Sequence, residues 1–355
     1  MERDWYSLLP EELEAEMKNL GEGAFRGRQI FRWLHQKGAV SFDQMTDLGE
    51  PLRRKLGAVQ SLVPLVTEQR QVSRMKGGGR TGKYLFRLPD GHWIETVLME
   101  YSYGYSLCIS SQVGCRMGCR FCASTLKGLE RNLTAGEMLQ QIYAVEAEED
   151  LRISHVVVMG CGEPFDNYEE LLRFIRLINH PDGKNFSQRR ITVSTCGLTR
   201  RIRSFADQEL GVTLAVSLHA PDDETRRKIM RIANSVSMEE LMEACRYYTD
   251  RTHRRITFEY ALIRGVNDSR EQAKKLVSLL KGQLCHVNLI PINPVAECGM
   301  ARPDQETVQQ FFAILEQRHI PVTLRREMGS DIDAACGQLR ARAEQGDGGK
   351  KETGR

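Results

Sequence analysis

The feature that most constrains the fold is a regular alternation of short apolar segments with longer amphipathic ones, from about residue 104 to residue 325. The short segments predict strands at 105–111, 154–159, 190–195, 211–217, 256–262, 285–290 and 321–325. Helices are predicted between most of them, for example at 134–148, 168–179, 237–249, 269–281 and 305–318. Because such alternation produces a parallel sheet covered by helices, we expect an α/β fold that forms an open or partial barrel.

Two smaller parts precede the barrel. Residues 1–58 predict a helical accessory domain, and residues 59–103 predict a short β-strand linker with a hairpin turn at Pro89-Asp90-Gly91-His92. Within the first part, one helix begins at Pro10, a second contains Phe25 and Leu34, a short third follows Ser41, and a fourth covers 48–56. We assign 104–342 to the barrel and its C-terminal segment, and expect the glycine-rich, charged tail 343–355 to be disordered.

Basic residues gather in the predicted front helices, at positions that we expect to be exposed: Arg26, Arg28, Arg32, His35, Lys37, Arg53, Arg54 and Lys55. A basic ridge formed by these side chains could contact RNA phosphates. The same charges also fit an ordinary solvated helix face. The formal net charge of +3 does not decide between these interpretations.

Composition is typical of a soluble globular protein with a sizeable core. Its 355 residues are 41% hydrophobic, and no run of about eighteen apolar residues predicts a membrane span. The N-terminus lacks the basic start and apolar block of a secretory signal, so we expect a cytoplasmic protein. In a reducing compartment its ten cysteines are better interpreted as metal ligands, catalytic thiols or core residues than as a disulfide scaffold.

Three of these cysteines form the strongest chemical signal. Cys115, Cys119 and Cys122 follow the spacing C-x3-C-x2-C directly after the first predicted barrel strand. Three thiolates in eight residues can surround one soft metal centre. A closed structural zinc site usually has four protein ligands, and no fourth cysteine with matching spacing lies nearby. Three ligands on a four-iron cluster would leave one iron open for a small molecule.

This motif, with Phe121 before its last cysteine, resembles the signature of the radical-SAM superfamily. The resemblance implies a [4Fe-4S] cluster whose open iron is chelated by S-adenosylmethionine (SAM), which is then cleaved to a 5′-deoxyadenosyl radical. It also implies which residues hold SAM. Gly162 and Glu163 resemble the Gly-Glu-Pro stretch that contacts the SAM amino group, and further positions at strand ends resemble those that line SAM: Ser194, Ser217, Leu218, His219 and Asn293.

A narrower resemblance lies near the C-terminus. The stretch from Arg325 to Leu339, together with 108–115 and 131–134, resembles the RlmN-type adenine-C2 methyltransferases and their C8-methylating resistance relatives, the Cfr proteins. The resemblance covers roughly residues 10–340. Two positions depart from the family pattern. Cys161 stands where methionine is usual, and 231–234 replaces a proline-containing turn.

The resemblance implies an S-methylcysteine mechanism with two SAM molecules per turnover. One SAM methylates Cys336, and the radical from the second activates that methyl group for addition to adenine C2. Glu95 is then the base that removes the C2 proton, and Cys108 is the thiol that releases product by forming a disulfide with Cys336. Without the resemblance, Cys108 would be interpreted as a core thiol and Glu95 as a surface carboxylate. Five more cysteines are expected to be structural: Cys161, Cys196, Cys245, Cys285 and Cys298.

The resemblance further implies a monomer that acts on 23S rRNA in the peptidyl-transferase region, and on tRNA 3′ of the anticodon. It also implies a flavodoxin or ferredoxin electron donor. The alternative is methylation at C8 of adenine. Pro164 is the one residue that favours C2 over C8 methylation. A tRNA methylthiotransferase would need a second cysteine cluster, yet no cysteine precedes Cys108. A non-catalytic iron–sulfur protein would not need both Cys108 and Cys336.

Overall fold

The computed structural model describes residues 4–74, 79–292 and 299–325. Its main sheet runs in the order β1-β2-β3-β4-β7-β8-β9-β10-β11-β12. The strands β1 to β4 pair antiparallel, and from β4 onward every neighbouring pair is parallel. The bounds are β1 Val66–Arg74, β2 Arg80–Arg87, β3 Trp93–Tyr101, β4 Gly104–Cys108, β7 Ile153–Val158, β8 Ile191–Thr195, β9 Thr213–Ser217, β10 Ile256–Leu262, β11 Cys285–Pro291 and β12 Val322–Leu324.

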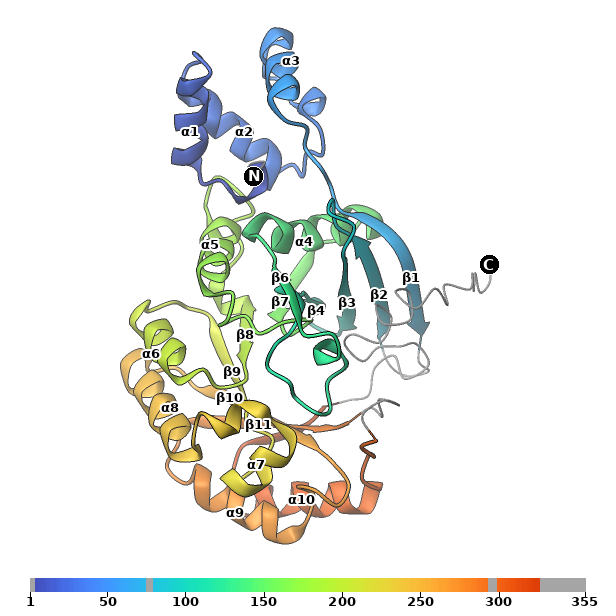
Figure 1. The fold of residues 1–355 in the computed structure, drawn as a ribbon, viewed down its shortest axis with the longest axis vertical. Helices are drawn as coiled ribbons and strands as arrows, with labels where there is room; N and C mark the ends of the chain where they lie inside the picture. The colour runs from blue at the N-terminus through green and yellow to red at the C-terminus, as the bar shows by residue number, and fades with distance from the viewer. Residues whose placement is uncertain (1–3, 75–78, 293–298, 326–355) are drawn as a thin grey trace.

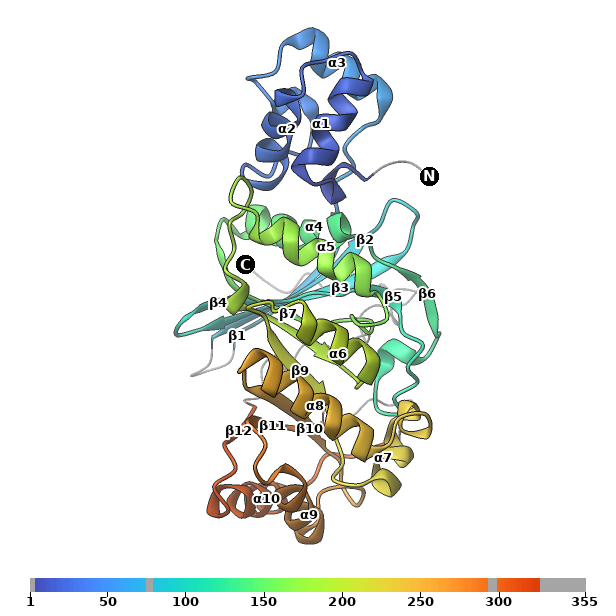
Figure 2. The ribbon, with the colours of Figure 1, turned by 90° about the vertical axis from the view of Figure 1, so that its left-hand side faces the viewer.

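Helices cover the outer face of this sheet. In Figure 2, α4, α5, α6 and α8 lie one below the other along it, with α9 and α10 at the far end. Their bounds are α4 Ala135–Glu149, α5 Tyr168–Asn179, α6 Thr199–Asp207, α7 Asp223–Ile229, α8 Met238–Thr252, α9 Arg270–Leu280 and α10 Gln305–Gln317. Polar caps fix several starts, since Thr134, Ser237 and Ser269 each accept a hydrogen bond from the first turn. The predicted α/β partial barrel is confirmed.

The N-terminal residues form three helices at one end of the molecule, next to α4 and α5 (Figure 1). They are α1 Pro10–Asn19, α2 Phe25–His35 and α3 Glu50–Val59. The short third helix expected after Ser41 is a single 3₁₀ turn, Phe42–Gln44. Buried side chains of these helices, such as Leu13 and Phe31, belong to the same hydrophobic cluster as those between the sheet and its helices. The front helices therefore pack onto the barrel through a continuous core.

The prediction that His35 is exposed is wrong. Only 2% of its surface is accessible, and its Nδ1 lies 2.9 Å from the hydroxyl of Tyr143 on α4. Burial lowers the pKa of His35 to about 3, so the ring is neutral. Of the neighbouring basic residues, Arg28 pairs with Glu14 at 2.6 Å and Arg32 with Asp182 at 2.8 Å. Part of the expected basic ridge is thus buried or neutralised by acidic partners.

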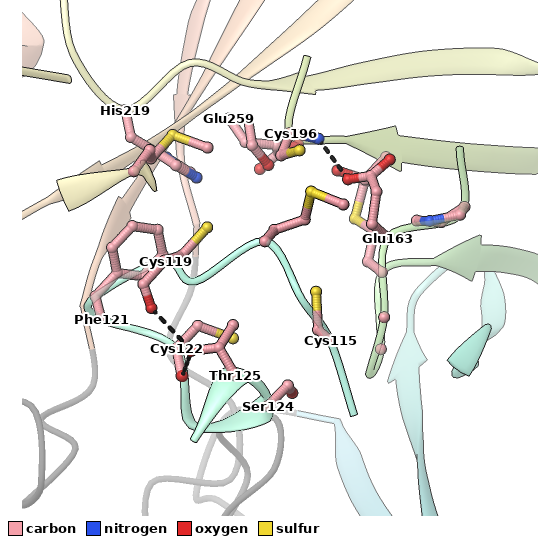
Figure 3. Close-up of a pocket in the computed structure, with 18 of the residues that line it drawn as sticks. Cys115, Cys119, Phe121, Cys122, Ser124, Thr125, Glu163, Cys196, His219 and Glu259 are labelled. Carbon is pink, nitrogen blue, oxygen red and sulfur yellow. Dashed lines mark hydrogen bonds between the residues drawn. The ribbon is translucent and has the colours of Figure 1, made fainter. Parts of the chain in front are cut away.

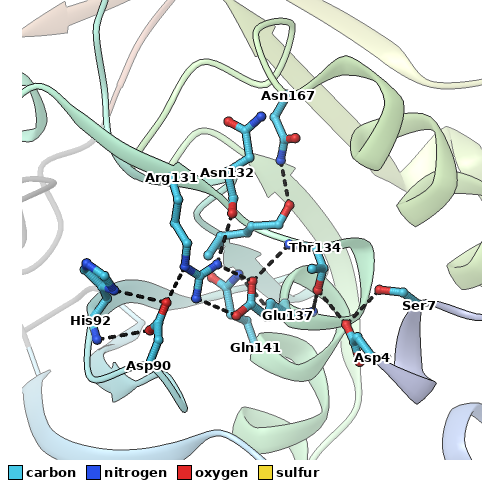
Figure 4. Close-up of polar contacts among 11 residues, drawn as sticks. Asp4, Ser7, Asp90, His92, Arg131, Asn132, Thr134, Glu137, Gln141 and Asn167 are labelled. Atoms are coloured by element: carbon cyan, nitrogen blue, oxygen red, sulfur yellow. Dashed lines mark hydrogen bonds and ion pairs between the residues drawn. The ribbon is translucent and has the colours of Figure 1, made fainter. Parts of the chain in front are cut away.

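Polar contacts fix the front segment to α4 (Figure 4). A carboxylate oxygen of Asp4 accepts hydrogen bonds from the hydroxyls of Thr134 and Ser7, and the Ser7 hydroxyl accepts one from the amide of Gly136 at 2.7 Å. A Cβ at Gly136 would lie 2.2 Å from that Asp4 oxygen, so the close approach requires glycine. No helix within the described ranges is long and apolar enough to cross a membrane.

Candidate active site

The three cysteines lie on one loop that leaves β5 (Gln112–Gly114) and returns to β6 (Leu129–Asn132). The loop is held in shape by hydrogen bonds among its own residues. The amide of Cys115 donates to the carbonyl of Gly128 at 2.8 Å, and the hydroxyl of Thr125 donates to the carbonyl of Cys122 at 2.9 Å. As a result Cys115, Cys119 and Cys122 all line the same pocket (Figure 3).

This pocket has a volume of about 230 Å³ and lies at the carboxyl ends of the parallel strands. Within the described part of the chain, no three His, Cys, Asp or Glu side chains converge on one point as the ligands of a single ion would. A cluster of several irons is wider than one ion, so its thiolates can stand farther apart around a shared cavity. Burial raises the pKa of Cys115 to about 12 and that of Cys119 to about 11. Thiolates here therefore need a cationic partner such as iron.

A buried arginine behind this loop supports the same assignment. Arg226 on α7 is fully buried, and its Nη2 donates to the carbonyl of Cys196 at 2.7 Å. Its Nη1 is also buried but has no hydrogen-bond partner among the described residues, and its charge acts on Cys119. A buried guanidinium with an unused donor requires a nearby acceptor. A three-thiolate cluster is anionic and would supply such an acceptor, so the residues present fit this group.

Glu163 lies across the pocket from the cysteines, in the loop after β7. Its carboxylate is 4% exposed and accepts hydrogen bonds from the amides of Cys196 at 2.7 Å and Phe165 at 3.0 Å. Burial nevertheless raises the pKa of Glu163 above its ordinary value. The preceding Gly162 has φ +110°, and a Cβ there would lie 2.6 Å from Gln112 Cβ. Glycine is therefore required for the loop to bring Glu163 to the pocket.

Further residues at strand ends complete the predicted SAM set. Ser194, Ser217 and His219 line the pocket together with Gly162 and Glu163. His219 adopts a left-handed conformation with φ +57°, and its Nδ1 accepts a 2.9 Å hydrogen bond from the amide of Ala261. Burial lowers the pKa of His219 to about 3, so the ring is neutral with its proton on Nε2. The Leu218 side chain belongs to the core instead, so only its backbone can face a ligand.

Glu95 and Cys108 do not line this pocket but lie on the adjoining part of the sheet. Val97, two residues after Glu95 on β3, pairs directly with Cys108 on β4, so the three side chains share one face. Glu95 is 5% exposed and forms an ion pair with Lys83 at 3.1 Å. The alternative interpretation of Glu95 as a surface carboxylate, which would apply without the family resemblance, is therefore wrong. Asn293, Cys298, Cys336 and the tail 343–355 lie outside the described residues.

Sequence reasoning missed Glu259, Arg226 and Lys83. Glu259 on β10 lines the pocket, and its carboxylate accepts a 2.8 Å hydrogen bond from the amide group of Asn288. For Glu259 and Lys83, the sequence signal that could have identified them is a charged residue within a predicted strand. Cys196 also lines the pocket, although it was expected to be purely structural. Cys245 and Cys285 are core thiols in a helix and a strand, as predicted, and Cys161 is buried next to the carbonyl of Gly114.

Comparison with known proteins gives consistent similarities. Residues 109–277 match the radical SAM superfamily, and residues 5–62 match the ribosomal RNA large subunit methyltransferase N-terminal domain. The chain is 52% identical to a protein of Lachnoclostridium phytofermentans, over 95% of this chain and 94% of that one. It is 53% identical to a protein of Lachnospira eligens, over 95% of each. Both carry the name "Probable dual-specificity RNA methyltransferase RlmN".

One solved structure is similar over nearly the whole chain. The radical SAM methyltransferase from Sphaerobacter thermophilus superimposes with a TM-score of 0.88 and 46% sequence identity, covering 94% of this chain and 98% of that one. The front helices, the linker strands and the barrel are all included in a match of this extent.

Proposed function

The chain belongs to the RlmN family of radical SAM RNA methyltransferases, and from that premise we propose that it methylates C2 of an adenosine in 23S rRNA and of an adenosine next to the anticodon in tRNA. The observation that carries this proposal is the shared sheet face of Glu95 and Cys108 beside the cysteine-lined pocket. A protein that only bound RNA or sensed redox state would have no use for a buried carboxylate and a thiol placed together there. The relatives' name, with its words "dual-specificity", supports more than one RNA substrate.

The pocket residues have separate tasks. Cys115, Cys119 and Cys122 hold a [4Fe-4S] cluster, and Glu163 accepts hydrogen bonds from the SAM ammonium. Gly162, Ser194, Ser217, His219 and the backbone of Leu218 shape the rest of the SAM site, with Asn293 completing it. When bound, these two groups supply the methyl group and the radical chemistry, with two SAM molecules used per turnover.

The protein's own residues then carry the covalent steps. Cys336 bears the methyl-derived carbon and links it to C2 of the adenine. Glu95 takes the C2 proton, and the Cys108 thiolate attacks the Cys336 sulfur. An S–S bond replaces the bond from sulfur to the methyl-derived carbon, which keeps the bonding electrons and takes up a solvent proton to complete the methyl group. The resulting disulfide must be reduced before the next turnover. We propose a flavodoxin or ferredoxin system as the electron donor, a monomeric enzyme, and the cytoplasm as its place of work, because rRNA and tRNA are found there.

The helical front, residues 1–58, is proposed as the RNA-binding accessory part. Its attachment to α4 through Asp4 and Ser7 would hold it at a fixed position relative to the pocket. Exposed arginines that pair with acids in the free protein, such as Arg28 and Arg32, could exchange those partners for phosphates.

Nucleoside mass spectrometry tests the proposed reaction. Purified, cluster-loaded protein is incubated with SAM, a reductant and either 23S rRNA or tRNA from a strain that lacks the gene. We expect 2-methyladenosine in both RNAs, and none with a Cys336→Ala variant. Formation of 8-methyladenosine instead would move the enzyme to the C8 class, and methylation of only one RNA would restrict its specificity.

A further inference from the structure

A fully buried lysine stands beside Glu95. The Lys83 side chain has no exposed surface, and its Nζ lies 3.1 Å from Glu95 Oε2. Both residues are on the strands before the barrel, in stretches that otherwise consist mainly of buried side chains. Two opposite charges have thus been placed together inside the protein, at the residue that we propose as the base.

The strand register explains how they meet. Lys83 on β2 pairs with Val97, and Val97 pairs on its other side with Cys108. Glu95 is two residues before Val97, so it is the diagonal neighbour of Lys83 on the same face of the sheet. Lys83, Glu95 and Cys108 therefore surround Val97. Met99, Val157 and Met159 pack against Val97 and Cys108 on this face.

Stability does not account for this ion pair. Removing two charges from water costs several kcal/mol per ion, and replacing a buried pair by apolar residues of similar volume is often neutral or stabilising by about 1–4 kcal/mol. Leu85 lies directly opposite Glu95, and Val97 directly opposite Lys83, so apolar side chains fit on this face. A charged pair kept at such a position points to a role in the chemistry of the face that it occupies.

We propose that Lys83 is the positioning residue of the proton-accepting step, acting through Glu95. By holding Oε2, the ammonium group fixes the orientation of the carboxylate and so the direction of its other oxygen. When the C2–H bond of the RNA adduct breaks, the proton passes to Glu95 and the bonding electrons stay in the purine ring. The unpaired electron left by radical addition would pass to the oxidised iron–sulfur cluster. This inference rests on the proposed role of Glu95.

The test compares Lys83→Met, Lys83→Arg and Glu95→Gln in single-turnover reactions of cluster-loaded protein with an RNA fragment. Three quantities are measured: 5′-deoxyadenosine formed, protein–RNA adduct on a denaturing gel, and methylated RNA released. We expect Lys83→Met to form 5′-deoxyadenosine and adduct at the wild-type rate but to release product at least tenfold more slowly. Lys83→Arg, which keeps the charge, should recover part of that rate. A merely structural role would slow the earlier steps as well.

The variants separate the failure of this inference from failure of the proposed function. If Glu95→Gln releases methylated RNA normally, Glu95 is not the base and the inference on Lys83 fails with it, while methylation of the RNA itself still stands. If Glu95→Gln accumulates adduct while Lys83→Met releases product at the wild-type rate, only the role of Lys83 is overturned. Should Lys83→Met not fold, Lys83→Gln takes its place, because its amide can still donate to Glu95 but carries no charge. The same accumulation of adduct is then expected, and its absence contradicts the inference.

Discussion

The hydroxyl of Ser110 donates a 2.7 Å hydrogen bond to the carbonyl oxygen of Glu95. The same hydroxyl accepts a 3.0 Å hydrogen bond from the amide of Cys161, next to the glycine that precedes Glu163. One buried side chain thus joins the strand that carries the proposed base to the loop that carries the proposed SAM ligand. The relative position of the two sites depends on this contact, because Ser110 has no exposed surface and neither partner can turn to water instead.

Ser110→Ala should therefore destabilise the protein and impair activity together. Leaving the Glu95 carbonyl and the Cys161 amide without their partner costs about 1–3 kcal/mol. Urea unfolding measures that loss. Ser278→Ala serves as the control, since this serine is exposed on α9 and should change stability by less than about 0.5 kcal/mol. Equal effects of the two substitutions would contradict the importance of the Ser110 bridge.

How much of this could be predicted from the sequence depends on the range of the interactions involved. The strands, the helices and the cysteine loop follow from local periodicity and spacing, and the loop does bring its three thiols to one pocket. Burial of His35 could not be predicted, because the helix pattern does not reveal that Tyr143, more than a hundred residues later, covers that face. The pairing of Lys83 with Glu95 likewise depends on the register of two strands, which the sequence of neither strand determines.

Cys119→Ala should lose iron and SAM cleavage together. Loss of one of three thiolates leaves the cluster under-ligated, so little 5′-deoxyadenosine should form with dithionite as reductant. Iron content and visible absorbance of the anaerobically reconstituted protein measure the first effect. Cys245→Ala is the matched control, because that thiol is buried in the core of α8 and should leave iron content unchanged. A brown, SAM-cleaving Cys119→Ala protein would disprove the assignment of the cluster.

Glu163→Gln should weaken SAM binding at least tenfold while leaving iron content unchanged. The substitution keeps one hydrogen-bond acceptor but removes the charge that we propose faces the SAM ammonium. Burial raises the pKa of Glu163, so wild-type affinity should begin to fall on acidification at a higher pH than for an ordinary glutamate. The variant should lack this component of the pH dependence. Equilibrium dialysis with labelled SAM across a pH series measures both effects, and identical profiles would refute the role.

Acid should destabilise the protein through His35. Burial lowers the pKa of its imidazole to about 3, whereas in the unfolded chain it is about 6.5. Between these values the unfolded state binds the proton and the folded state does not, so stability falls as the pH is lowered, by up to about 1.4 kcal/mol per pH unit. His35→Phe should remove this part of the slope in urea unfolding. His219 is present in both the wild type and His35→Phe. The difference between their slopes of unfolding free energy against pH therefore reports His35 alone.

The Cys108→Ala variant tests the proposed catalytic scheme as a whole. Cys336 should still become methylated, the radical should still form, and addition to adenine should still occur, because these steps need only the cluster, SAM and Cys336. The reaction should then stop with RNA bound covalently through Cys336, since no thiolate attacks its sulfur. Denaturing gels should show the adduct, and peptide mapping should place the methyl label on Cys336.

Three further variants define the order of the steps. Cys336→Ala should give no adduct, because the carrier atom is missing, and the double variant Cys108→Ala/Cys336→Ala should behave like Cys336→Ala alone. Glu95→Gln should also accumulate adduct, in this case because no base removes the C2 proton. If Cys108→Ala turns over normally, Cys108 is a structural thiol beside Val97, and another sulfur must release the product. Cys161 is then the first to test, since it is buried in the loop between β7 and Glu163, next to the carbonyl of Gly114, which precedes Cys115.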